Sequence, residues 1–186
     1  MSENDALEAA LAPLRRLHGR DSSSPLHPSA LPAEAMPQPY RTLLAHNNDM
    51  TQTLQTYHGE ETVLKVHQSR HDGTDYLREV SLVLTPSGSA VEYGVICLHL
   101  ATFSDAMREA VLDNARPLGA LIASQQLKVK HTPGPYFSVQ PDARILDFLN
   151  MKQAPTLYGR CNTIRLSDDT PIAQVVEILP LLPNTI

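Results

Sequence analysis

The sequence holds few of the features that mark secreted, membrane and nucleic-acid-binding proteins. Its only two cysteines, Cys97 and Cys161, lie far apart and inside predicted strands, so we expect free, buried thiols of a cytoplasmic protein. No apolar run approaches the length that spans a bilayer, and the start, Met1 to Asp5, is acidic without a leading basic cluster. We therefore expect neither membrane insertion nor a signal peptide.

A basic excess is also lacking. The chain has 15 Lys and Arg against 20 Asp and Glu, a formal net charge of −5, and no dense run of basic residues. Binding to a phosphate backbone requires a basic surface, so we expect no nucleic-acid partner. A small anionic ligand would have to be met by local positive groups.

Short motifs that carry cofactor or metal chemistry are missing. There is no glycine-rich phosphate loop, no Cys-x-x-Cys and no His-Glu-x-x-His. His67 and His71 straddle a predicted strand end and turn, and no other nearby carboxylate has ligand spacing, so we expect no metal site. Cys97 lies between Ile96 and Leu98, which predicts an inert thiol. An enzyme with this sequence would work without cofactor, metal or covalent intermediate.

The composition is that of a globular domain. Of 186 residues, 42% are hydrophobic and 19% charged. Over 4–17 leucines recur at helical spacing, and Pro13 is expected to divide the segment into two short turns. Residues 19–39 are rich in proline and serine and predict an irregular linker. We expect an N-terminal helix and linker over 1–39, and the organised domain over 40–186.

The organised part alternates strands and helices. Apolar, β-branched runs separated by turn residues predict an antiparallel meander over 62–68, 75–84 and 91–98. Further strands are expected at 127–131, 136–139, 157–166 and 171–180, and helices at 50–57, at 104–112, from Pro117 and from Pro141. This order favours an α+β fold, in which helices pack on one face of an antiparallel sheet of about six strands.

Two predicted strands carry a charge in an apolar row. Alternation along a strand places Arg78 with Tyr76 and Val80, and places Glu177 with Val175 and Leu179. An unpaired buried charge costs several kcal/mol, so each must find a partner or a ligand. Either the two form structural ion pairs with each other or with neighbouring charges, or they sit exposed on a solvated face, or they line a pocket. Spacing alone does not decide between these interpretations.

Five segments together resemble a known family. They are Asp49-Met50-Thr51, Tyr76-Leu77-Arg78-Glu79-Val80, Arg116-Pro117-Leu118-Gly119, Leu157-Tyr158-Gly159-Arg160 and Val176-Glu177-Ile178-Leu179-Pro180. In this order and at these separations, over about residues 40–181, they resemble the chorismate pyruvate-lyase family. Known members of that family convert chorismate to 4-hydroxybenzoate and pyruvate.

The resemblance implies a chorismate-lyase-like fold with an interior ligand site, no cofactor, and chorismate and 4-hydroxybenzoate as substrate and product. It makes Arg78 and Glu177 the catalytic pair, with Arg78 on the ring carboxylate and Glu177 on the ring hydroxyl. Met50 and Leu118 become lining residues, and Arg160 becomes a candidate partner of the second carboxylate. Met50 as core filler and Arg160 as an exposed strand arginine remain open alternatives.

The chemistry agrees with parts of this assignment. A planar guanidinium grips a carboxylate through two hydrogen bonds, and a helix that opens at Pro117 turns free N–H groups toward an anion. Loss of the enolpyruvyl group yields an aromatic ring, so orientation in a dry pocket would supply most of the acceleration. Such a pocket would also hold its product, so that release limits turnover.

A second function of a different class is a non-catalytic domain that binds aromatic acids, related to the effector domains of transcription regulators. Residues 1–39 are too short and too proline-rich for a winged helix, which weighs against a regulator. Release of pyruvate from chorismate separates the lyase from the binding domain. For the lyase, Arg78→Ala and Glu177→Ala are each expected to lose most activity and keep the fold.

Overall fold

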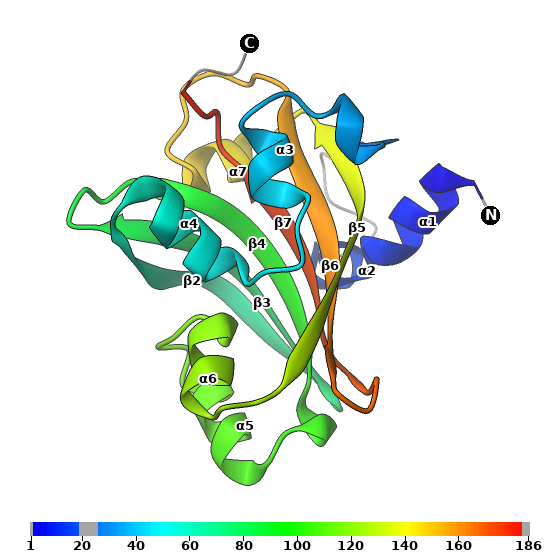
Figure 1. The fold of residues 1–186 in the computed structure, drawn as a ribbon, viewed down its shortest axis with the longest axis vertical. Helices are drawn as coiled ribbons and strands as arrows, with labels where there is room; N and C mark the ends of the chain where they lie inside the picture. The colour runs from blue at the N-terminus through cyan, green and yellow to red at the C-terminus, as the bar shows by residue number, and fades with distance from the viewer. Residues whose placement is uncertain (1, 19–25, 184–186) are drawn as a thin grey trace.

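A seven-stranded antiparallel sheet forms the frame of the molecule (Figure 1). The structure is a computed structural model that describes residues 2–18 and 26–183. The strand order is β1-β5-β6-β7-β4-β3-β2. The strands are β1 (Ser29–Leu31), β2 (Glu61–Asp72), β3 (Asp75–Thr85), β4 (Ala90–His99), β5 (Val129–Val139), β6 (Leu157–Leu166) and β7 (Pro171–Leu179). The predicted α+β class with an antiparallel sheet is confirmed, with one strand more than the six or so expected.

The predicted meander is formed by β2, β3 and β4. Asp72 pairs with Asp75 across a tight turn, in which Gly73 has a φ of +61°. This backbone conformation is one that glycine adopts without a steric penalty. The chain returns from the far edge of the sheet through β5, β6 and β7, and β7 lies against β4. Arg78 and Glu177 therefore stand two strands apart, with β4 between them.

Strand β5 is one element where the sequence suggested two short strands and a turn. Its pairing with β6 continues on both sides of a register shift between Pro133 and Tyr136. Proline has no N–H to donate to the ladder, which is why the irregularity falls at this point. Because the pairing resumes after the shift, the turn expected at 132–135 does not reverse the chain.

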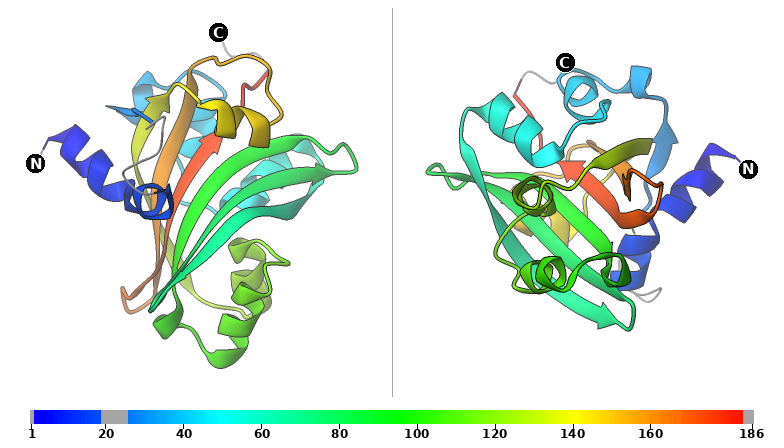
Figure 2. Two further views of the ribbon diagram at one scale, coloured as in Figure 1. Left: turned by 180° about the vertical axis from the view of Figure 1, so that it is seen from behind. Right: turned by 60° about the horizontal axis from the view of Figure 1, so that its bottom comes forward.

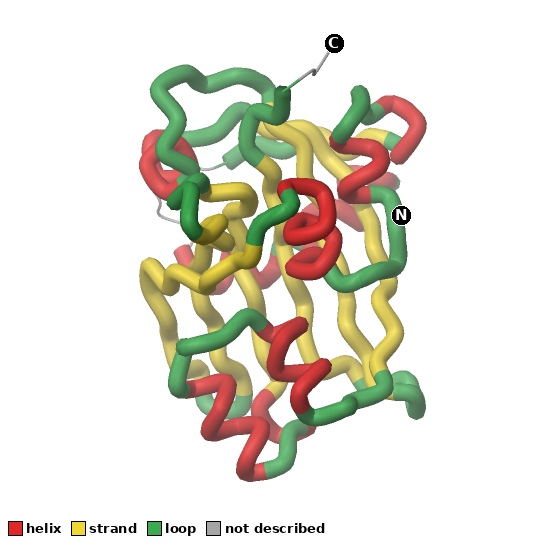
Figure 3. The backbone as a smooth tube through the Cα atoms, turned by 60° about the vertical axis from the view of Figure 1, so that its left-hand side comes forward, coloured by secondary structure: helices red, strands yellow, loops and turns green. Residues whose placement is uncertain are grey.

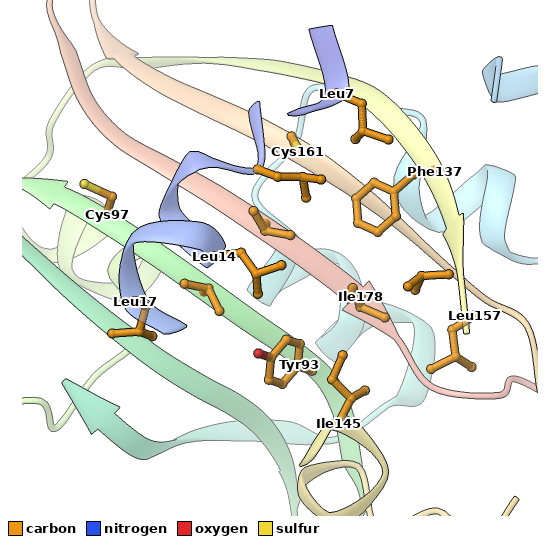
Figure 4. Packing of buried hydrophobic residues seen from close by; sticks show 14 of the residues in the cluster. Leu7, Leu14, Leu17, Tyr93, Cys97, Phe137, Ile145, Leu157, Cys161 and Ile178 are labelled. Carbon is orange, nitrogen blue, oxygen red and sulfur yellow. The ribbon is translucent and has the colours of Figure 1, made fainter. Parts of the chain in front are cut away.

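Helices lie on both faces of the sheet, which corrects the expectation of a single face (Figures 1 and 2). One face carries α3 (Tyr40–Leu44), α4 (Met50–His58), α5 (Asp105–Leu112) and α6 (Leu118–Ser124). The other carries α1 (Glu3–Ala10), α2 (Ala12–His18) and α7 (Ala143–Phe148). Leu7 and Leu14 of the N-terminal helices pack in one buried cluster with Tyr93 of β4 and Ile178 of β7 (Figure 4). This face of the sheet is apolar as well, so it also has to be covered.

The N-terminal region is more ordered than a helix and linker. The predicted division at Pro13 is confirmed, because α1 ends at Ala10 and α2 begins at Ala12. Within the expected linker, Ser29–Leu31 pairs with β5 and Ala33–Ala35 forms a 3₁₀ turn. The paired strand covers the edge of β5, whose backbone N–H and C=O groups need partners. Residues 19–25 lie outside the described part of the chain.

Two buried clusters share the face that carries α3 to α6. One lies beneath α3 and α4 and includes Leu54 and Leu82, and the other lies against α5 and α6 and includes Ile96 and Leu121. Helices α5 and α6 stand at one end of the strands, and α3 and α4 lie nearer the other (Figures 1 and 3). A hollow remains between the clusters. Among the described residues, no helix is both long and apolar enough to cross a bilayer.

Candidate ligand-binding site

A cavity lies between the two clusters, with the sheet as its floor. Its empty volume, including the part open to solvent, is about 550 Å³. Apolar side chains form most of its wall, among them Leu64, Val80, Leu82, Ile164 and Val175. Polar side chains lie at fewer positions: Asp49, Arg78, Glu92, His131, Asn162 and Glu177. An apolar enclosure with a few convergent polar groups is the usual form of a small-molecule site.

The first residues of α4 and α6, with the residues just before them, form part of the cavity wall. Asp49 caps α4 by accepting a hydrogen bond of 2.9 Å from the backbone N–H of Gln52. Pro117 is the residue before α6, not its first helical residue. A side chain on Gly119 would collide with the Asp49 carboxylate, so glycine lets the two helices approach closely. As a result Met50 and Leu118 both line the cavity.

Arg78 reaches the cavity from β3 with an incompletely bonded guanidinium. The side chain is 1% exposed, and Nε has no hydrogen-bond partner. The two other bonds are long, 3.4 Å to Asn114 Oδ1 and 3.5 Å to the carbonyl of Arg116. Burial lowers the pKa of Arg78 to about 10, which still leaves it cationic at neutral pH. Within the described residues no carboxylate forms an ion pair with it.

Asn114 orients Arg78 from the loop between α5 and α6. It follows the C-cap of α5, Asp113, and has a φ of +59°, a conformation that asparagine tolerates better than most residues. Its Nδ2 donates to the Tyr76 hydroxyl at 2.6 Å, which turns Oδ1 toward the guanidinium. Asn114 thus holds Arg78 through a neutral group and leaves its charge uncompensated.

Replacing Asn114 by aspartate is expected to weaken the binding of any anion at Arg78 about tenfold. The new carboxylate would lie where Oδ1 now stands, 3.4 Å from the guanidinium, and would compete with an anionic ligand for its N–H groups. Calorimetric titration with 4-hydroxybenzoate, the product that the five-segment resemblance implies, measures the change, with the exposed Asn4→Asp as the matched control. Unaltered affinity in Asn114→Asp, with the fold intact, would show that the ligand does not use Arg78.

Glu177 reaches the cavity from β7 but already has a cationic partner. Arg160 of β6 stands directly opposite in the register, and its Nε donates to Glu177 Oε2. The same guanidinium donates to the carbonyls of Leu44 and His46 at 3.0 and 2.9 Å. Burial is the largest single effect and lowers the pKa of Arg160, but Glu177, Glu92 and Tyr136 together raise this pKa above its ordinary value.

The sequence left open whether each buried charge forms a structural ion pair or lines a pocket, and the two residues differ in this respect. Glu177 forms an ion pair with a neighbouring charge, whereas Arg78 has no acidic partner among the described residues. Arg160 is fully buried, so it is not an exposed strand arginine. It is not one of the residues that line the cavity, and its guanidinium ties the segment after α3 to the sheet. Its contact with a second carboxylate stays a prediction.

Sequence reasoning missed Glu92, a further acidic side chain of the cavity. It lies on β4, on the same side as Gly94 and Ile96, and is 5% exposed. Burial, followed by the nearby Glu177 carboxylate, raises the pKa of Glu92 well above its usual value. The signal was present, because alternation along 91–98 places this charge in an apolar row, as it does Arg78.

His131 and Asn162 were missed as well. They come from the paired strands β5 and β6, and Asn162 Nδ2 lies 3.2 Å from His131 Nδ1. Burial is the main cause that lowers the pKa of His131, which favours the neutral ring. Asn162 Oδ1 has no partner. No local motif marks these residues, because long-range pairing brings them to the cavity.

The histidines named in the metal argument have other contacts. His67 stacks on Phe148 with ring centroids 3.6 Å apart and lies 2.7 Å from Ser81 Oγ. A different group, Asp75, Cys97 and His99, brings three potential ligand atoms within 4.8 Å of one another. The guanidinium of Arg16 donates to Asp75 at 2.8 Å and to Cys97 at 3.3 Å. A cation here would have to compete with Arg16.

Both cysteines are free and buried, as predicted. Burial raises the pKa of Cys97 to about 11 and that of Cys161 to about 12. Thiols with such values hold their protons at neutral pH and are poor nucleophiles. Neither residue lines the cavity.

Comparison with solved structures identifies the fold. PhnF from Mycobacterium smegmatis superposes with a TM-score of 0.53 at 17% identity over 71% of this chain and 63% of that one. Its separately solved effector domain superposes with a TM-score of 0.53 at 17% identity, over 70% of this chain and 87% of the domain. The Staphylococcus aureus gene product SA0254 gives 0.50 at 9% identity over 64% of this chain and 82% of that one. The fold is chorismate-lyase-like.

At these identities the likeness concerns the fold of the chain alone. No family model and no curated protein matches the sequence. The chain spans 63% of the length of PhnF, so the matched region is a part of that protein. Arg78, Glu177, Met50 and Leu118 all line one cavity of this fold. The roles toward a substrate that the five-segment resemblance assigns to them stay predictions.

Proposed function

We propose that this chain binds a small aromatic acid in the cavity between the two clusters, with the carboxylate of the ligand on Arg78. The observation that supports this most is the incomplete bonding of Arg78, which is 1% exposed and has no partner for Nε. A buried cation without a counter-ion costs free energy that a bound carboxylate would offset. The likeness to the effector domain of PhnF supports a ligand-binding role for the fold.

The dimensions suit a single ring with a polar group at each end. Arg78 and Val80 are two residues apart on β3, and Glu177 lies at the level of Val80 two strands away. Strand geometry then separates the Cα atoms of Arg78 and Glu177 by roughly 12 Å. The two side chains cover part of that span, and apolar residues line the space between them. A hydroxyl at the far end of the ring would donate to Glu177.

The test is calorimetric titration of the full chain with 4-hydroxybenzoate and with 4-hydroxybenzamide, which has the same shape without the charge. We expect the acid to bind and the amide to bind at least thirtyfold more weakly, since a buried charge pair contributes about 2–5 kcal/mol. Equal affinities, or no binding of the acid by a folded protein, would overturn the proposal.

A second candidate function is the chorismate lyase reaction itself. It is favoured by the meeting of Arg78, Glu177, Met50 and Leu118 around one cavity, the positions to which the resemblance assigned the substrate. Chorismate carries two carboxylates, and Arg160 is already bonded to Glu177, so the second carboxylate needs another partner. Neutral His131 and Asn162 are the polar groups available on that wall.

Pyruvate release distinguishes the two functions. Chorismate is mixed with the protein, and pyruvate is followed by a coupled assay. A lyase is expected to produce pyruvate and to slow as 4-hydroxybenzoate accumulates. Binding of 4-hydroxybenzoate without pyruvate above the blank would leave the binding domain as the function.

A further inference from the structure

Glu92 extends into the cavity beside a glycine that makes room for it. Gly94 lies directly opposite both Val80 and Glu177 in the sheet, and Glu92 precedes it by two residues on the same side of β4. A Cβ on Gly94 would lie 3.4 Å from Glu92 Oε1 and 3.3 Å from Val80 Cγ2. The Glu92 carboxyl therefore lies over Gly94, at the end of the cavity where Glu177 also stands.

Among the described residues no cation forms a direct ion pair with Glu92. Its Oε2 is buried and has no hydrogen-bond partner. Leu82 faces it from β3, and Leu64 of β2 and Met50 of α4 contribute further apolar wall to the cavity. An isolated carboxylate in such surroundings is costly, and the neutral acid costs much less.

Taken together, the charged groups around Glu92 raise its pKa, as burial does. Glu177 of β7 and Asp49 before α4 disfavour its ionised form, and Arg160 of β6 favours it. The Arg160 guanidinium is already bonded to Glu177 and to two backbone carbonyls. His131 of β5 lines the same cavity with its pKa lowered by burial, and Arg78 lies further along the sheet. Burial and the nearby Glu177 thus favour the protonated form of the Glu92 carboxyl, whose O–H can donate a hydrogen bond.

We propose that Glu92, as a neutral carboxylic acid, donates a hydrogen bond to the ligand and makes the cavity selective for monoanionic acids that carry a hydroxyl at the far end. This deepens the proposed function and rests on it. Beside Glu92 the ionised Glu177 only accepts, so together the two carboxyls complete both bonds of a hydroxyl. A second carboxylate at that end would meet Glu177 and find only one donor.

Selectivity follows from what each end group can do. A hydroxyl both donates to Glu177 and accepts from Glu92, whereas a methoxy group only accepts and an aromatic amine is a poor acceptor. Sites built to bond a ligand hydroxyl reject analogues that leave a buried polar group without its partner. The expected order of affinity is 4-hydroxybenzoate, then 4-methoxybenzoate and 4-aminobenzoate, with the dianion terephthalate weakest.

The experiment measures 4-hydroxybenzoate affinity against pH by calorimetry, over a range in which the ligand stays a monoanion. At pH values above the folded-state pKa of Glu92, the affinity of the unaltered chain is expected to fall about tenfold per pH unit. Glu92 then loses its donor and carries a negative charge close to the anionic ligand. Glu92→Gln, which keeps an N–H donor and cannot ionise, is expected to lose this slope. Glu92→Met is expected to bind roughly 5- to 10-fold more weakly at low pH. The exposed Glu109→Gln is the control.

A ligand-free measurement separates the possible failures. Since burial raises the folded-state pKa of Glu92, the folded protein binds the proton more tightly than the unfolded chain. Stability from this group is complete below its unfolded pKa and is lost as the pH rises toward the folded one, so Glu92→Gln should gain in Tm over the unaltered chain as pH rises.

Three outcomes are decisive. Binding of 4-hydroxybenzoate with the same pH slope in Glu92→Gln overturns the role of Glu92 and leaves the proposed function standing. No binding at any pH, with the expected gain in Tm for Glu92→Gln, overturns the proposed function and the selectivity with it. If the Tm difference between Glu92→Gln and the unaltered chain does not change with pH, the pKa of Glu92 is not raised by folding. The proposed role of Glu92 is then overturned, whichever ligands bind.

Discussion

Arg78→Met is expected to weaken the binding of 4-hydroxybenzoate by roughly 30- to several-thousand-fold, because truncating one partner of a buried charge pair costs about 2–5 kcal/mol. The same substitution is expected to make the empty protein more stable. Arg78 is 1% exposed, and its guanidinium has an unbonded Nε and no acidic partner among the described residues. Methionine fills a similar volume without a charge, so the cost of burying an uncompensated cation is removed and the free energy of unfolding is expected to rise.

The opposite signs of the two effects make this prediction specific. Affinity is measured by calorimetry, and stability by urea or thermal unfolding without ligand. Arg41→Met, at an exposed site on α3, is the matched control and is expected to change neither. A large loss of stability in Arg78→Met would mean that the guanidinium is a structural group, and retained affinity would mean that the ligand carboxylate lies elsewhere.

Alternation along strands predicted much of the candidate site. Because side chains on a strand alternate between faces, Arg78 and Glu177 could be assigned to apolar rows before the sheet was known. Their cavity-facing neighbours Val80 and Val175 confirm those rows. The same rule applied to 91–98 identifies Glu92, so its omission reflects incomplete use of the pattern rather than a missing signal.

Long-range geometry accounts for what the sequence could not show. The pairing of Glu177 with Arg160 depends on β6 lying beside β7, and two consecutive strands in a chain need not be paired in a fixed register. Likewise, the left-handed conformation of Asn114 depends on how α5 ends, and only its contact with Tyr76 shows why it matters. Such contacts join residues that carry no recognisable local motif.

The N-terminal region shows the same limit on the other face of the sheet. Leucine spacing and Pro13 predicted two short helices correctly, but spacing alone does not say which surface a helix covers. The strand Ser29–Leu31 has only three residues in a proline-rich setting, and it forms because the edge of β5 offers unpaired backbone groups. Both outcomes depend on a sheet that is built from residues far along the chain.

Glu177→Ala is expected to destabilise the protein by about 3–5 kcal/mol, since removing one partner of a buried ion pair leaves the other charge uncompensated. The charge left uncompensated would be that of Arg160, whose side chain is 0% exposed and whose Nε donates to Glu177. The ion pair therefore changes the expectation, drawn from the sequence alone, that Glu177→Ala keeps the fold. Urea unfolding without ligand measures the loss, and the exposed Glu109→Ala is the control.

A double-mutant cycle measures how much of the expected loss of stability comes from the ion pair between Glu177 and Arg160. Arg160→Met alone frees the carbonyls of Leu44 and His46 and leaves Glu177 unpaired, so it too is expected to destabilise. If the ion pair is the cause, Arg160→Met with Glu177→Ala together will cost less than the sum of the two single changes, with a coupling of about 0.5–3 kcal/mol. Additive losses would contradict it. Since an unstable Glu177→Ala protein loses activity whatever its ligand contacts, only affinity measured on the fully folded fraction reports on the hydroxyl contact.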